Sequence, residues 1–361
     1  MRHLVGKRAC LVVLFALLLV APAFGNQYHS FIANLILLYI ILSMGLNLLI
    51  GYAGQLALSN AAMYGIGAYA TGLMMVHFGW PYWAAAAFGV LFAMVSGTLL
   101  ALPALRLSGI YLALATLAFA QTTFWVMTHW TQVTFGAGGF VPPPLDFSPL
   151  PLTQSEGIYY LSWIAAALLY LVAKRTMESP IGRAFVAIRD GEVAAQALGI
   201  DLLRYKALAF AMSGFYAGVA GALYSGLLGF VGPESFDLLQ MVLHKGAVVL
   251  GGMGSVVGSV LGGVLLTVLV EVTKEMKFSI EIAFGGLLIV FVLFQPQGIV
   301  MFFKKWLPGW VERLHYLPRD MQQQPAEPAA QSKPGLEPGS KAGPKPGPEP
   351  HAKPAAVEGD D

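Results

Sequence analysis

The stretch GLNLLIGYAGQLALSNAAMYGIGAYA, residues 45–70, decides the fold of this chain. Long apolar side chains fill most of it, but small or polar residues interrupt it, at Asn47, Gly51, Gly54, Gln55 and Ser59. Backbone that is not helical is stable at membrane depth only where protein or a water-filled cavity surrounds it. The stretch therefore predicts a broken helix enclosed by other membrane helices.

The composition of the whole chain points to the same environment. Of the 361 residues, 57% are hydrophobic and 11% are charged, and the formal net charge is +2. Between residues 9 and 173 the charged side chains are Arg106, Asp146 and Glu156, which are too few to cover a water-soluble globule. The near-neutral balance without a basic cluster argues against nucleic-acid binding. A single cysteine, Cys10, excludes an internal disulfide and a multi-cysteine metal site.

The apolar runs predict an all-α integral membrane protein, because they lack the strict alternation of barrel strands. They lie at residues 9–24, 30–50, 54–78, 81–103, 107–129, 158–174, 207–230, 239–271 and 278–303. The first run follows basic residues and is compatible with either a signal peptide or a first helix. We expect a polytopic bundle of about nine or ten membrane segments, some of them broken or re-entrant.

Positive charges predict the orientation of this bundle. They concentrate between residues 174 and 206 and again between 304 and 313, which places both regions, and both chain termini, in the cytoplasm. Both basic regions can lie on the cytoplasmic side only if residues 239–271 cross the membrane twice or re-enter it. That run contains GGMGS at its middle, so we predict a second break at Gly251, Gly252 and Gly254.

The chain divides into two parts by composition. Residues 1–316 are expected to form one transmembrane domain, which includes a cytoplasmic loop over 175–206. Residues 317–361 hold ten of the 22 prolines and no aromatic side chain, so they are predicted to form a disordered tail.

No pattern in the sequence indicates an enzyme. The HExxH, CxxC and GxSxG motifs are absent, and the seven histidines are scattered singly, which leaves no metal site. There is no Walker A lysine either, so the chain is expected to bind no cofactor. If ATP drives its activity, another subunit must bind the nucleotide.

Two groups of residues are candidates for a solute pathway. The first group comprises the two predicted breaks, since transporters bind polar solutes at interrupted helices. The second is the pair His244 and Lys245 inside the apolar run QMVLHKGAVVLGG. Lys245 either extends outward toward Glu234 or Asp237, or lines the solute entrance. Small residues at four-residue spacing, such as Gly214 and Gly218, are interpreted mainly as helix-packing contacts.

The loop over residues 175–206 is predicted to contain two short helices. Ser179 and Pro180 suit the N-cap and first position of one helix, and Asp190 is expected to cap a second that stops at Gly199. On that second helix, Ala195 and Gly199 would leave a smooth face. The helix is either an ordinary amphipathic surface helix or a peg that docks in a groove of a cytoplasmic partner.

The sequence resembles one family, the LivM-type permeases of branched-chain amino-acid ABC importers. The likeness runs over about residues 30–303 through six blocks in the family's order. They are residues 45–70, LRLSGIYLALATLAFAQ (105–121), SPIGRAFVAIRDGEVAAQALGID (179–201), YKALAFAMSGFYAGVAGALY (205–224), VVLGGMGSVVGSVLGG (248–263) and FQPQGI (294–299).

The resemblance implies an importer in a bacterial inner membrane, built from this permease, a second related permease, two ATP-binding ABC subunits and a periplasmic solute-binding protein. It implies transport of branched-chain, hydrophobic amino acids with ATP bound on the partner subunits. It also implies a coupling segment that contacts the ATPases, here Arg183, Arg189, Asp190, Glu192, Ala194, Ala195 and Gly199. Within that segment, Val193 is an extra residue relative to the general Glu-Ala-Ala form. The proline-rich tail is not part of the resemblance.

Three alternatives stay open at this stage. Related permeases that carry urea or short amides share the same blocks. A secondary transporter working alone would need buried carboxylates, which are not found deep in a span between residues 9 and 173. A membrane scaffold or receptor would have no use for broken helices and a folded cytoplasmic peg.

Overall fold

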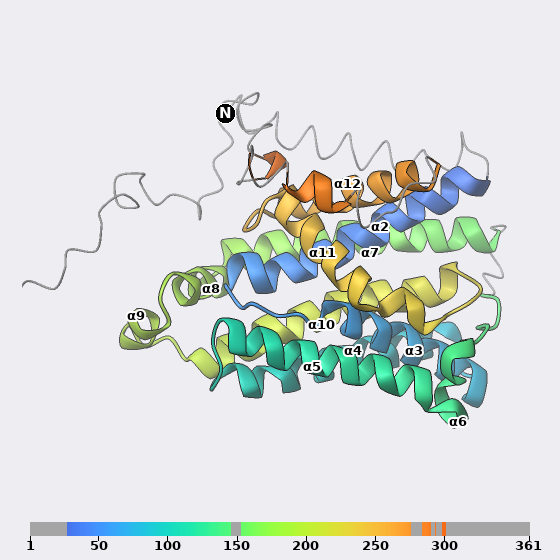
Figure 1. The fold of residues 1–361 in the computed structure, drawn as a ribbon, viewed down its shortest axis with the longest axis horizontal. Helices are drawn as coiled ribbons and strands as arrows, with labels where there is room; N and C mark the ends of the chain where they lie inside the picture. The colour runs from blue at the N-terminus through green and yellow to red at the C-terminus, as the bar shows by residue number, and fades with distance from the viewer. Residues whose placement is uncertain (1–26, 146–152, 276–283, 290–292, 294–297, 301–361) are drawn as a thin grey trace, which may run out of the picture. The chain divides into compact units, whose positions relative to one another are not determined.

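The computed structural model describes residues 27–145, 153–275, 284–289, 293 and 298–300. Within these residues the protein is helical without a β-strand, and an isolated antiparallel bridge joins Phe140 to Val231 (Figure 1). The predictions for the run 9–24, for most of the run 278–303 and for the tail 317–361 lie outside the described residues.

Within the part of the chain that the structure describes, eight longer helices form the bundle: α2 (Gln27–Asn47), α3 (Asn60–Phe78), α4 (Tyr82–Ala104), α5 (Ile110–His129), α7 (Gln154–Glu178), α10 (Leu202–Leu227), α11 (Leu238–Gly251) and α12 (Val256–Glu275). Shorter elements connect them: η1 (Leu48–Tyr52), α6 (Thr131–Thr134), η2 (Gly136–Gly138), α8 (Pro180–Asp190), α9 (Glu192–Ala197) and η3 (Pro233–Phe236). Among the described residues, six helices are long and apolar enough to cross a membrane, α2 with η1, α4, α5, α7, α10 and α12. The all-α membrane fold is therefore confirmed.

Helix α10 lies at the centre of the bundle, against α4, α3 and α2. Small residues make this packing possible: a Cβ atom on Gly67 of α3 would lie only 2.7 Å from the Cα of Gly218 in α10. One turn before Gly218, a Cβ atom on Gly214 would lie 2.6 Å from the carbonyl oxygen of Ala93 in α4. Small residues let helix backbones touch where lipid supplies no hydrophobic driving force. The packing interpretation of these glycines is confirmed.

The first predicted break separates α2 from α3. Helix α2 passes into one π-helical turn, η1, and the chain then runs without helical structure from residue 54 to 59. Figure 1 shows this stretch returning from the end of α2 toward the middle of the bundle before α3 begins. The break predicted within residues 51–60 is therefore confirmed, and the helix of the apolar run 54–78 starts at Asn60.

The second predicted break separates α11 from α12. Helix α11 has 14 residues, so it is about 21 Å long and shorter than the hydrocarbon core of a bilayer. Residues 252–255 then turn the chain, with Gly252 and Gly254 at positive φ, and α12 packs back against α11. The broken hairpin predicted at GGMGS is confirmed.

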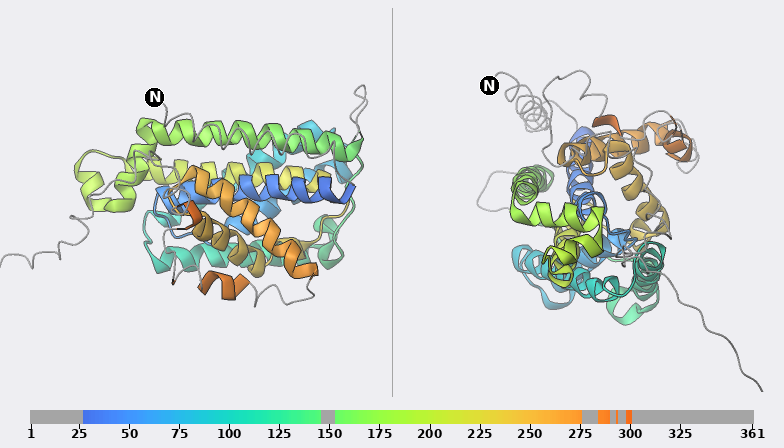
Figure 2. Two further views of the ribbon diagram at one scale, coloured as in Figure 1. Left: turned by 90° about the horizontal axis from the view of Figure 1, so that it is seen from above. Right: turned by 90° about the vertical axis from the view of Figure 1, so that its left-hand side faces the viewer.

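The two ends of the bundle carry different structures. The short helices α8 and α9 project beyond one end (Figures 1 and 2). At the other end lie α6 and the bridge between Phe140 and Val231, whose backbone N–H and C=O groups exchange hydrogen bonds of 3.1 and 2.8 Å. The loops around residues 130–145 and 175–200 thus lie at opposite ends, as expected. The prediction that α8 and α9 are cytoplasmic stays a prediction.

Candidate functional site

Helix α8 begins as the sequence predicts. The Ser179 hydroxyl accepts a hydrogen bond of 3.1 Å from the Ile181 N–H, and Pro180 occupies the first helical position. The apolar side of α8 buries Phe185 and Ile188, whereas Arg183 is exposed. Helix α8 is therefore an anchored amphipathic helix with Arg183 on its free side.

Helix α9 begins differently from the prediction. Asp190 does not cap it, because α8 continues through Asp190 and Gly191 becomes the N-cap residue of α9. The Asp190 carboxylate instead lies 3.1 Å from Nε of Arg189. The expected end is correct: α9 finishes at Ala197, and Gly199 follows with φ of 84°, a conformation that glycine adopts without strain.

Helix α9 and the residue after it expose an apolar patch, but it is not the face that the sequence indicated. Ala195 is buried, so it does not form a smooth outer face with Gly199. Val193 and Leu198 are instead 83% and 81% exposed, and Ala194 lies exposed beside them. Sequence reasoning missed these two side chains, although large apolar residues in an otherwise polar loop were a usable signal.

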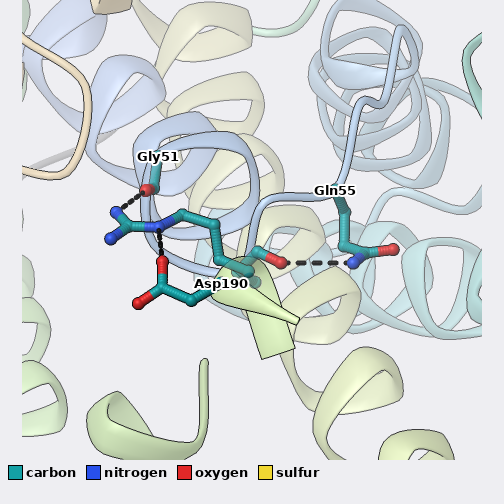
Figure 3. A network of polar contacts seen from close by, with 5 residues as sticks. Gly51, Gln55 and Asp190 are labelled. Atoms are coloured by element: carbon teal, nitrogen blue, oxygen red, sulfur yellow. Dashed lines mark hydrogen bonds and ion pairs between the residues drawn. The ribbon is translucent and has the colours of Figure 1, made fainter. Parts of the chain in front are cut away.

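Arg189 joins α8 to the first break. Its Nη1 donates a hydrogen bond of 2.9 Å to the carbonyl oxygen of Gly51, as Figure 3 shows. Gly54 has φ of 67°, and a Cβ atom on it would lie 2.9 Å from the Cα of Arg189. A side chain at residue 54 would therefore be strained and would also push α8 away.

A second connection runs from α9 into the bundle. The carboxylate of Glu192 lies 2.7 Å from Nζ of Lys206, which also donates a hydrogen bond of 3.0 Å to the carbonyl oxygen of Ala104. Nε2 of Gln55 donates to Ala53 O at 3.1 Å and reaches the same carboxylate at 3.4 Å. Glu192 therefore contacts both the first break and the start of α10.

Lys206 differs from its predicted position as a loop charge. It belongs to α10, and its side chain is only 2% exposed. A buried ammonium is stable only when it is paired and hydrogen-bonded, which Glu192 and Ala104 provide. Sequence reasoning did not single out Lys206 as a site residue; its place one turn into an apolar helix was the available signal.

The two breaks, predicted from separate parts of the chain, contact each other. Nδ2 of Asn47 donates to Ser255 O at 2.8 Å and to Ser259 Oγ at 2.7 Å, while its Oδ1 accepts from the Gly254 N–H at 2.8 Å. The Tyr52 hydroxyl accepts from the Val256 N–H at 3.2 Å. The polar atoms of Asn47 are thus used to hold the start of α12.

The remaining predicted pathway residues lie around these breaks. A Cβ atom on Gly251 would lie 2.9 Å from the Cα of Gly262, so Gly251 allows α11 and α12 to touch. Gly252 makes the turn that follows. Ser59 is the buried N-cap residue of α3, and its side chain makes no capping hydrogen bond.

His244 and Lys245 have different surroundings. His244 is buried in α11, with Nδ1 at 3.1 Å from Asn60 Oδ1 and its ring beside those of Tyr39 and Tyr64. Lys245 is half-buried and forms no ion pair with any described residue, so the predicted interaction with Glu234 or Asp237 is not present.

Comparison with known proteins identifies the family. The profile of the family described as "Branched-chain amino acid transport system / permease component" matches residues 28–293. The chain belongs to this permease family. The resemblance inferred from the sequence is confirmed, and the family is one of transport permeases rather than enzymes.

Several relatives of this permease carry the name LivM. It is 33% identical to the high-affinity branched-chain amino acid transport system permease protein LivM of Escherichia coli, over 82% of this chain and 75% of that protein. LivM of Salmonella typhimurium is also 33% identical, over 80% and 74%. The autoinducer 2 import system permease protein LsrC of Yersinia pseudotuberculosis is 26% identical, over 68% and 70%. No solved structure matches this permease.

Family membership makes this permease a multi-pass membrane protein of a bacterial inner-membrane transport family. Importers of this kind work with ATPase and binding-protein partners. Permease subunits of the family bind no cofactor of their own, and the partner ATPases bind the ATP.

Proposed function

We propose that this permease is the membrane-spanning subunit of an ABC importer that translocates branched-chain, hydrophobic amino acids. The two LivM relatives at 33% identity support this solute class. The observation that carries the proposal is the direct connection of α8 and α9 to the first break and to α10, through Arg189 to Gly51 and through Glu192 to Gln55 and Lys206. A permease without an ATPase of its own needs such a connection to receive force.

The partners in this proposal are a second related permease, two ATP-binding subunits and a periplasmic solute-binding protein. The apolar tip at Val193 and Leu198, with Ala194 and Gly199 beside it, docks in a groove of one ATPase. Arg183 and Asp190 are exposed on α8, which leads into α9, and they form the polar rim of the contact. Both chain termini are then on the ATPase side, in the cytoplasm.

The mechanism is a switch between two packings of the bundle. ATP binding closes the ATPases and displaces α8 and α9. Arg189 and Glu192 transmit the displacement to the first break and to α10, and Asn47 carries it on to the start of α12. The nucleotide biases the balance of inward-open and outward-open states, and the permease changes no covalent bond.

The pathway residues have two roles in this scheme. The flexible joints are formed by the residues that bond or turn the backbone at the two breaks: Asn47, Gly51, Gly54, Gln55, Gly251, Gly252 and Gly254. Ser59, His244 and Lys245 face the route of the solute, because they lie at the start of α3 and along α11.

Two experiments test the proposal. The permease and its cognate partners are reconstituted in liposomes, and ATP-dependent uptake is measured for leucine, isoleucine, valine, aromatic amino acids and urea. Uptake of the branched-chain members supports the proposal. Preference for urea, or concentration of solute by this chain alone, contradicts it.

The second experiment tests the coupling role. Glu192→Lys reverses the charge opposite Lys206, and Gly199→Phe places a bulky side chain where φ is positive and at the tip. Both variants should insert in the membrane and lose solute-stimulated ATP hydrolysis. Normal stimulation in both variants contradicts docking by α9.

A further inference from the structure

Helix α3 starts inside the bundle rather than at its end. The residue two positions before it, Leu58, donates its N–H to the Thr116 hydroxyl at 2.8 Å. Thr116 is six residues into α5, which corresponds to about 9 Å from the start of that helix. His244, which contacts Asn60, is the seventh of the 14 residues of α11. The first turn of α3 is therefore enclosed by protein at an intermediate depth.

This first turn leaves donors without acceptors. The leading N–H groups of a helix have no intrahelical partner and attract negative charge. Ser59 does not cap them with its side chain. The Asn60 side chain, 3% exposed, leaves its Nδ2 without a hydrogen bond among the described residues. The first turn of α3 and Asn60 Nδ2 thus place donors in one enclosed region, where a carboxylate would accept from them.

His244 supplies the opposite kind of group. The amide oxygen of Asn60 can only accept, so the proton between the two side chains belongs to His244 Nδ1. In the neutral imidazole, Nε2 then carries a lone pair and accepts. This Nε2 is buried and has no partner within the described part of the chain. An ammonium group would satisfy it.

We propose that the first turn of α3, with Asn60 and His244, binds the zwitterionic head of the transported amino acid. The carboxylate lies at the α3 amides and Asn60 Nδ2, and the ammonium lies at His244 Nε2. The inference rests on the proposed function and names the site within it.

The aromatic side chains around His244 suit the rest of such a solute. The rings of Tyr39 and Tyr64 lie with their centroids 5.6 and 5.8 Å from that of His244. Aromatic faces attract an ammonium and pack against an aliphatic side chain. The two rings pack on His244 in this conformation, so they must separate when the solute enters.

Unpartnered polar groups alone do not define this site. Asn34 in α2 is equally buried and leaves both polar atoms of its amide without a described partner. Asn34 lies within a continuous helix, however, and has no neighbouring helix start to add further donors. It therefore serves as a matched control for Asn60.

Photo-crosslinking locates the solute directly. The permease is reconstituted with its cognate ATPases, partner permease and binding protein, and photo-leucine is supplied with ATP under illumination. Labelled peptides should contain Tyr39, Tyr64 or residues of α11. Uptake of photo-leucine with labelling confined to other parts of the permease overturns the site. A complex that takes up no branched-chain solute contradicts the proposed function instead.

Variants at Asn60 separate binding from structure. Asn60→Asp keeps the shape and the acceptor for His244 Nδ1, but it removes the donor and repels a carboxylate. The site predicts at least a tenfold loss of maximal leucine uptake in Asn60→Asp, compared with the unaltered permease at equal amounts of assembled complex. Asn34→Asp should retain uptake within about twofold. Uptake in Asn60→Asp equal to that in Asn34→Asp overturns the inference.

Discussion

The two broken helices of this permease differ in what holds them. The break before α12 spans only residues 252–255, and Asn47 and Tyr52 supply its hydrogen bonds from the other break. The break before α3 is longer, and it contacts α8 and α9 through Arg189 and Glu192. In the proposed mechanism, the break before α3 is therefore a driven joint, the break before α12 is a following joint, and Asn47 connects the two.

The largest effect is expected from cutting that connection. Asn47→Leu removes three hydrogen bonds and leaves the buried Gly254 N–H without its described acceptor, whereas the Ser255 carbonyl still accepts from the Ser259 N–H. The unsatisfied amide costs about 1–3 kcal/mol and each of the two other lost bonds about 1 kcal/mol, so the free energy of unfolding should fall by about 3 kcal/mol or more. Thermal unfolding in nanodiscs measures the change.

Asn34→Leu is the matched control for this prediction. Its amide has no described partner, so replacement by a side chain of similar size should leave the melting temperature unchanged or raise it. An equal loss of stability in both variants would show that Asn47 has no special role between the breaks.

The next effect concerns the driven joint alone. Lys206→Met removes the buried partner of Glu192 and should lower solute-stimulated ATP hydrolysis at least tenfold. The cost in stability should be about 1–3 kcal/mol, less than for a fully buried pair because Glu192 is partly exposed. A double-mutant cycle with Glu192→Gln measures the pair. Additive effects of the two substitutions would contradict the proposed connection.

A smaller effect distinguishes the glycines of the two joints. Gly54→Ala places a Cβ at positive φ against Arg189, so it should cost about 1–2 kcal/mol and also weaken ATPase stimulation. Gly252→Ala, also at positive φ, should cost a similar amount of stability but leave stimulation closer to normal. Coupled ATPase assays and unfolding curves on the same preparations compare them. Equal uncoupling by both substitutions would erase the distinction between the joints.

The smallest effect on stability is expected at the exposed tip of α9, the helix that contacts the driven joint. Val193 is 83% exposed, so Val193→Asp should change the free energy of unfolding by less than about 0.5 kcal/mol. The same substitution should prevent co-purification of the partner ATPases, because a charge is placed in an apolar docking surface. Gln196→Asp, on the same helix, is the control for charge alone and should retain the ATPases.

Sequence patterns predicted both breaks because glycine and polar residues at membrane depth have few stable arrangements. The Ser179–Pro180 helix start and the stop at Gly199 were predicted for the same kind of reason, since capping depends on neighbouring residues. The assignment of Asp190 as a cap was wrong because α8 continued one residue further than local preferences indicated. Ala195 faces inward because of packing, which periodicity over six residues does not determine.

The sequence by itself determined the membrane environment, the two interruptions and the family, since each depends on composition or on local order along the chain. Only the tertiary structure decided that Asn47 bonds to Ser255, that Lys206 pairs with Glu192 and that His244 lies beside Asn60. Asn47 and Ser255 are 208 residues apart in the sequence, and His244 and Asn60 are also far apart. Lys206 and Glu192 are closer in the sequence. Buried polar groups must find partners wherever the packing of helices brings them, and that packing is a property of the whole bundle.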